Sequence, residues 1–169
     1  ELRAPSIKGA LRFWWRALHG HLGLEELKKR EEAIFGGTNN GGRRSSVIIR
    51  VSHPSLNVGP SMLVPHKPFM KQNAIQEGQE FEVFLSITKK VEGFTIEHLA
   101  VLFKITCILG GFGKRVRRGM GSVMIIGCVS SEPVPDEITL PYIHQLLSHF
   151  SNFFVLSDKS LQLNYPGRS

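Results

Sequence analysis

Cysteine and aspartate are scarce in this sequence. Among 169 residues there are two cysteines, Cys107 and Cys128, and two aspartates, Asp136 and Asp158. Without a carboxylate cluster, two-metal phosphoryl transfer lacks its ligands, and the seven histidines have no zinc-ligand spacing. We therefore expect core thiols rather than a disulfide, and no metal, no cofactor and no catalytic residue.

Long apolar runs are also missing. No stretch approaches the 18 residues of a transmembrane helix, and no signal peptide is visible. These absences predict a cytoplasmic protein with no membrane partner. Hydrophobic residues make up 41% of the chain, which is typical of a folded globule, and the length suits a single domain spanning residues 1–169.

Acidic residues are outnumbered by basic ones. Lysine and arginine total 21 against 14 aspartates and glutamates, a net charge of +7, and the isoelectric point is near 9.7. A chain this basic is predicted to bind a polyanion.

The basic residues concentrate in one glycine-rich stretch, Gly110 to Ser122, which reads GGFGKRVRRGMGS and contains no acid. Glycine permits positive φ and close backbone approach, so such a loop can turn amide groups toward a phosphate. The alternative is a flexible helix end with solvated charges. The phosphate-binding candidates here are Gly111, Gly113, Lys114, Arg115, Arg117, Arg118, Gly119 and Gly121.

The flanks of this loop exclude the usual nucleotide-binding loops. The segment TIEHLAVLFKITCIL before it predicts a helix, and SVMIIGCV after it predicts a strand at 122–130. P-loops and dinucleotide-binding loops run in the order strand, loop, helix. Their residue patterns are absent as well, so ATP and NAD are not expected.

A second basic feature lies near the N-terminus. Ser6 is expected to cap a helix that ends at Gly20, with Ile7, Leu11, Trp14 and Trp15 on its apolar face. Lys8, Arg12 and Arg16 form a stripe at spacing i, i+4, i+8, which a bound phosphate chain would explain and which a solvated polar face would also explain. We expect this stripe to line the same groove as the glycine loop.

The rest of the chain predicts a mixed pattern of helices and strands. A second helix is expected over 23–35, followed by a polar loop whose Arg43 and Arg44 could contact phosphate or could be plain surface residues. Further expected elements are strands at 46–52 and 80–87, a long proline-rich loop at 53–78, an extra C-terminal helix at 138–155 and a short final strand at 161–165.

The order strand, strand, helix, glycine loop, strand resembles the RAMP superfamily of CRISPR-associated proteins. The runs RAPSIKGALRFWWRALHG and AIFGG are most similar to the first subunit type of the Cmr (type III-B) RNA-targeting complex. The resemblance implies an α+β, ferredoxin-like (RRM-like) domain that binds guide or target RNA beside other Cmr-type subunits without being the nuclease. It makes Lys8, Arg12, Arg16 and the loop from Lys114 to Arg118 the RNA-contact candidates.

The chain departs from that pattern in two respects. Members of the family usually carry two such domains, whereas the length here suits one. A ferredoxin-like domain begins with a strand that would precede Arg3, and its absence leaves a lane of the sheet empty. We expect the tail Leu161 to Tyr165, a strand exchanged with a second copy in a homodimer, or a partner chain to fill it.

Two other functions stay open. One is a metal-independent RAMP endoribonuclease that processes precursor guide RNA, with His19, His21 or His53 as base. The other is a protein-only scaffold that contacts its partners through the proline-rich loop.

Overall fold

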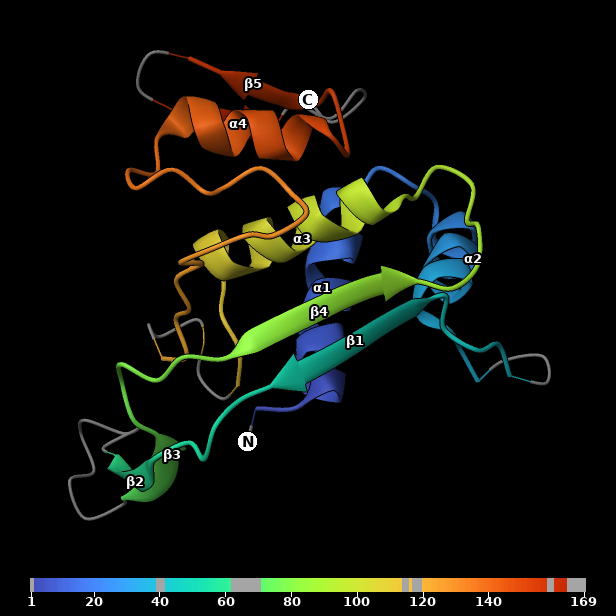
Figure 1. Cartoon of the computed structure of the whole chain (residues 1–169). Helices are drawn as coiled ribbons and strands as arrows, with labels where there is room; N and C mark the ends of the chain where they lie inside the picture. Colours follow the sequence, from blue (N-terminus) through green and yellow to red (C-terminus); the bar gives the residue numbers. More distant parts are fainter. Residues whose placement is uncertain are drawn as a thin grey trace.

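The computed structural model describes residues 2–38, 42–61, 71–113, 116, 120–157 and 160–163. Two helices, α1 and α3, pack on one face of an antiparallel strand pair, β1 and β4 (Figure 1). The other helices, α2 and α4, extend this helical layer. The fold therefore mixes helices with small sheets.

Helix α1 (Ala4–Leu18) forms the centre of the core. Ile7, Leu11, Trp15 and Leu18 recur at helical spacing and are all buried. The helix begins earlier than the expected cap at Ser6, because Pro5 occupies its first turn, where a missing N–H is harmless. Arg3 is the N-cap residue instead.

Helices α2 (Leu24–Phe35) and α3 (Ile96–Leu109) lie at the expected places. Thr95 caps α3 in a reciprocal arrangement with His98. Leu99, Leu102 and Ile105 of α3 are fully buried or nearly so. Cys107 of α3 is a buried free thiol, and burial raises its pKa to about 12.

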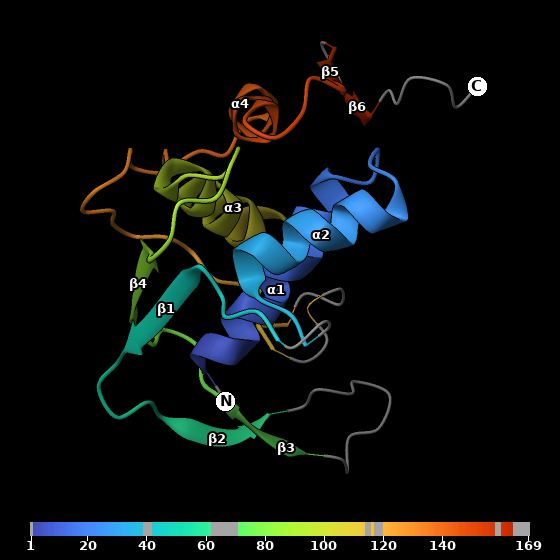
Figure 2. The same cartoon turned by 90° about the vertical axis from the view of Figure 1, so that its right-hand side faces the viewer.

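Strands β1 (Val47–Ser52) and β4 (Glu82–Ile87) pair antiparallel, with Ile49 opposite Leu85. Alternate side chains point to opposite faces, so Ile49 and Leu85 face the helices while Phe84 faces solvent. Figure 2 shows the strand pair on one side and the helices on the other.

The predicted strand at 122–130 is wrong. Val123 and Ile125 pack against the core, whereas Met124 is 80% exposed and Ile126 is 68% exposed, which is the alternation of a strand. Residues 123–130, however, pair with no strand among the described residues. A strand requires a hydrogen-bonded neighbour, and in the described part of the chain β4 pairs with β1 alone.

The segment 53–78 is more regular than the long loop expected there. It contains β2 (Val58–Ser61) and β3 (Gln72–Ile75), which form a separate antiparallel pair. This pair extends away from the helical layer (Figure 2).

The C-terminal part also differs from expectation. Helix α4 (Leu140–Ser148) ends well before residue 155, and β5 (Phe154–Leu156) and β6 (Leu161–Leu163) follow it as an antiparallel pair. Because Leu161–Leu163 pairs with β5, these tail residues do not fill the lane beside β4. The second copy and the partner chain stay as predictions. No helix of the described residues is long and apolar enough to cross a membrane.

Candidate nucleic-acid interface

The two ends of the glycine loop are held together at their base. The backbone N–H of Phe112 donates to the carbonyl oxygen of Gly121 over 2.9 Å. Gly111 and Gly121 have φ of 146° and 70°, both in the region that favours glycine. A Cβ on Gly111 would lie 2.5 Å from the Gly121 oxygen. The closure therefore requires glycine at both positions.

Aromatic packing anchors this base to the helices. Phe112 is buried and stacks on Phe103 of α3, with ring centroids 5.8 Å apart. On the α1 side, a Cβ on Gly110 would lie 2.6 Å from Nε1 of Trp14. Trp14 and Phe103 thus fix where the loop leaves the core.

Five of the predicted phosphate-binding residues lie outside the described residues, namely Lys114, Arg115, Arg117, Arg118 and Gly119. Gly113 is exposed, with φ of 103° and open space around its Cα. The structure thus describes the base from which the cations are presented, and their role in binding stays a prediction.

The basic stripe of α1 meets a carboxylate that the sequence analysis did not single out. Glu31 of α2 is 4% exposed. It accepts hydrogen bonds from Nε of Arg12 over 2.7 Å and from Nη2 of Arg16 over 2.6 Å. Burial alone would raise the pKa of Glu31, but the hydrogen bonds from Arg16 and Arg12 hold it below its ordinary value.

The third member of the stripe, Lys8, is half-buried. Burial lowers the pKa of its amine, and the neighbouring charge of Arg12 lowers it further. The side chains of Arg12 and Arg16 stay 33% and 52% exposed. Because a guanidinium has five donors, both arginines keep N–H groups for a further partner while Glu31 orients them.

The stripe and the base of the glycine loop lie on opposite flanks of α1. The expected groove shared by Arg12 and Arg117 stays a prediction, because Arg117 lies outside the described residues. At about 100° per residue, Arg12 and Trp14 are about 160° apart around the helix. Arg12 faces Glu31, whereas Trp14 faces Gly110. Figure 1 shows α2 on one side of α1 and the chain at 120–122 on the other.

Arg43 and Arg44 follow α2 and are exposed. The backbone of Arg43 exchanges two hydrogen bonds with Gly37, of 2.8 and 3.0 Å. Gly36 has φ of 81°, and a Cβ there would lie 2.6 Å from the Arg43 oxygen. The backbone of Arg43 is therefore held beside the end of α2, and Arg44 follows it.

Two residues, one on α2 and one on α1, were missed in the sequence. Glu31 falls four residues after Leu27 and three before Ile34, which is a core-facing helical position, so an acid there signals a buried partner. Phe13 falls opposite the apolar face of α1 and is 54% exposed.

Two of the three histidines named as candidate bases lie close together, since the ring centroids of His19 and His21 are 6.0 Å apart. His19 stacks on Trp15 with centroids 4.2 Å apart, and its Nδ1 lies 2.8 Å from the Trp15 oxygen. Burial lowers the pKa of His19. His53 directly follows the last residue of β1, and β1 ends near the start of α1 (Figure 1). No group of three metal-ligating side chains occurs in the described ranges.

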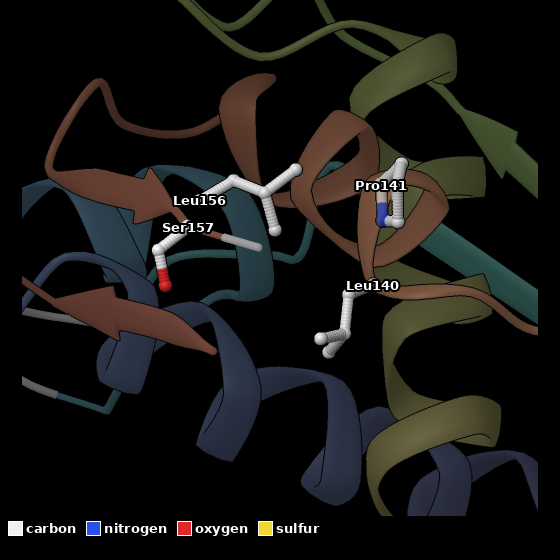
Figure 3. A pocket seen from close by; sticks show the side chains of 4 residues that line it. All are labelled: Leu140, Pro141, Leu156 and Ser157. Carbon is white, nitrogen blue, oxygen red and sulfur yellow. The ribbon is translucent and has the colours of Figure 1, made fainter. Parts of the chain in front are cut away.

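A hollow lies between α4 and β5. Its lining consists of Leu140, Pro141, Leu156 and Ser157 (Figure 3). Among the described residues, the serine hydroxyl is the only polar side-chain group of this lining, so the described lining offers no cation to an anion.

Gly121→Ala tests the loop closure. The new Cβ would overlap the carbonyl oxygen of Phe112 at a residue with φ of 70°, which costs the strain of a left-handed residue and the Phe112–Gly121 hydrogen bond. We expect a loss of about 2–3 kcal/mol in the free energy of unfolding, measured by urea titration. Gly127→Ala, which has open space around its Cα, should change that free energy by less than about 0.5 kcal/mol. Equal changes in the free energy of unfolding for Gly121→Ala and Gly127→Ala would contradict the requirement for glycine at position 121.

Comparison with known proteins finds relatives of this chain. The family model of the RAMP superfamily matches residues 1–124. The CRISPR system Cmr subunit Cmr1-1 of Pyrococcus furiosus is 34% identical over 152 residues, which cover 80% of this chain and 44% of the relative. Cmr subunit Cmr1-2 of the same organism is 31% identical over 159 residues, which cover 74% of this chain and 83% of the relative. The chain thus spans less than half of Cmr1-1.

A solved structure gives the same result for the fold. The crystal structure of apo Cmr1 from Pyrococcus furiosus aligns with a TM-score of 0.55 at 29% identity, over 76% of this chain and 43% of that one. The resemblance drawn from the N-terminal run and AIFGG is thereby confirmed, and the chain belongs to the RAMP superfamily, among relatives that are Cmr1 subunits.

Proposed function

We propose that this chain is a non-catalytic RNA-binding subunit of a Cmr-type CRISPR effector ribonucleoprotein. Its glycine loop binds phosphates of guide or target RNA. The observation that carries the proposal is the anchored base of the loop, where Phe112 and Gly121 close the backbone and Phe103 and Trp14 pack against it. This base holds together the two ends of the segment whose sequence carries the four cations.

The relatives support the choice of complex, because both curated ones are named as Cmr subunits. A subunit of such a complex contacts other subunits. The second edge of β4, which pairs with nothing among the described residues, offers unpaired backbone groups to a Cmr-type partner or to a second copy by strand exchange. Sedimentation at rising concentration distinguishes these two partners.

The direct test is a filter-binding titration of the full chain against single-stranded RNA over a salt series. Four phosphate contacts at the loop predict a slope of log K against log salt of about −2.8 or steeper. No binding at 50 mM salt, or binding independent of salt, would contradict the proposal and favour the protein-only scaffold.

The same RNA also tests the enzymatic alternative. The proposal assigns no base or acid to a histidine, so labelled precursor RNA should stay intact during incubation with the chain. Cleavage that is lost in His19→Ala or His21→Ala would replace the proposal with the endoribonuclease. His53→Ala is the third variant of this series, since His53 is exposed and hydrogen-bonds within its own turn.

A further inference from the structure

Helix α1 carries three consecutive aromatic residues in three environments. Trp15 is 2% exposed and belongs to the core, Trp14 is half-buried, and Phe13 is more than half exposed. Single exposed apolar residues are common on protein surfaces. The position of Phe13 relative to its neighbours is what distinguishes it.

Phe13 continues an aromatic surface that starts at the glycine loop. Its ring meets Trp14 edge to face, with centroids 5.9 Å apart and planes at 85°. Trp14 in turn lies against Gly110 at the start of the loop. The two rings form a ledge, which we call the Phe13–Trp14 ledge, running from solvent to the base of the loop.

The charge around this ledge suits a nucleic acid. Helix α1 contains no acidic residue between Ala4 and Leu18, and the stretch from Gly110 to Ser122 has four cations and no acid. Proteins that bind single-stranded RNA combine a cationic backbone site with aromatic side chains on which bases stack. Here Trp14 lies against Gly110, the first residue of the stretch whose sequence carries the four cations.

We propose that the Phe13–Trp14 ledge stacks a base of single-stranded RNA whose phosphates lie on the glycine loop. This inference rests on the proposed function and adds a base-stacking site to it. Phe13 presents the exposed ring face. Trp14 supports Phe13 from the side and connects it to the loop.

Phe84 provides a matched control on the other side of the molecule. It is 48% exposed, close to the 54% of Phe13, but lies on the outer face of the β1–β4 pair. The guanidinium of Arg50 already lies over its ring, 5.7 Å from the centroid. Phe84 is therefore a phenylalanine of similar exposure that is not next to the loop.

The test is RNA affinity of Phe13 variants by filter binding. Phe13→Ala should weaken binding about 5- to 150-fold, the range for loss of one base stack, without changing the salt slope, because no cation is removed. Phe13→Leu keeps apolar packing on Trp14 but has no π face, so it should bind as weakly. Phe13→Tyr should bind like the unmodified chain, and so should Phe84→Ala.

An abasic RNA of the same length identifies what the ledge contacts. The unmodified chain and Phe13→Ala should bind it equally, since no base is there to stack. Three results would contradict base stacking on the Phe13–Trp14 ledge. One is a difference in affinity between the unmodified chain and Phe13→Ala that persists on abasic RNA. The others are a normal RNA affinity of Phe13→Leu and a loss of affinity in Phe84→Ala equal to that in Phe13→Ala. If the Phe13 variants bind RNA normally while neutralised loop variants do not, the base-stacking proposal is wrong and the proposed RNA-binding function stands. If the unmodified chain binds no RNA, the base-stacking proposal and the proposed function are both wrong.

Discussion

Replacing Lys114, Arg115, Arg117 and Arg118 together by glutamine is expected to weaken binding of single-stranded RNA by roughly 600-fold at 0.1 M salt. Each phosphate contact contributes about 0.7 to the salt slope, so four contacts contribute about 2.8, acting over the decade between 1 M and 0.1 M salt. The slope itself should flatten by the same amount. Filter binding over a salt series measures both quantities.

A charge-matched variant shows whether RNA affinity depends on the position of the cations in the loop or only on the net charge of the chain. The loop variant lowers the net charge from +7 by four. Replacing four exposed lysines outside the loop by glutamine lowers it equally, and these are Lys28, Lys29, Lys89 and Lys90. If net charge alone attracts RNA, the two variants lose the same affinity and the loop has no special role. The loop proposal requires the lysine variant to keep most of its affinity and slope.

The double variant Arg12→Met with Arg16→Met is expected to lower the free energy of unfolding by about 3 kcal/mol. It removes both donors from Glu31, which is buried, and leaves an uncompensated carboxylate in the core. Glu31→Gln should cost less, about 1 kcal/mol, since the partly exposed arginines can turn toward water. Urea unfolding measures each change.

A triple variant and a control complete this test. Adding Glu31→Gln to the double arginine variant removes the buried charge and should recover most of the lost stability. Arg30→Met removes a partner of exposed Glu26 on the same helix and should change the free energy of unfolding by less than about 0.5 kcal/mol. A double arginine variant as stable as Arg30→Met would show that Glu31 needs no partner.

The pH dependence follows from the lowered pKa of Glu31. A carboxyl whose pKa is lower in the folded state stabilises the fold above its unfolded value, near 4.5, and this contribution is lost as pH falls through the folded pKa. Glu31 in the double arginine variant loses the hydrogen bonds that lower its pKa and becomes neutral more readily. The difference in unfolding free energy between the unmodified chain and the double arginine variant should therefore become smaller below about pH 4.5.

Periodicity alone located most of the fold. The spacing of Ile7, Leu11 and Trp15 predicts α1, the alternation at Val83 and Leu85 predicts β4, and Thr95 predicts the start of α3. These features depend on near neighbours in the chain. The strand at 122–130 was predicted by the same reasoning and is wrong, because its pairing depends on a neighbour that the described residues do not supply.

The candidate site also has features that the sequence predicts and features that depend on packing. The glycine loop, its charge and its order after a helix are predictable from the sequence alone, because composition and spacing are local properties. The contact of Glu31 of α2 with Arg12 and Arg16, and the contact of Trp14 with Gly110 on the opposite flank of α1, depend on how the helices pack. A stripe of cations has the same sequence pattern whether it faces solvent, RNA or a buried carboxylate. Its partner depends on how the helices pack, which the pattern does not show.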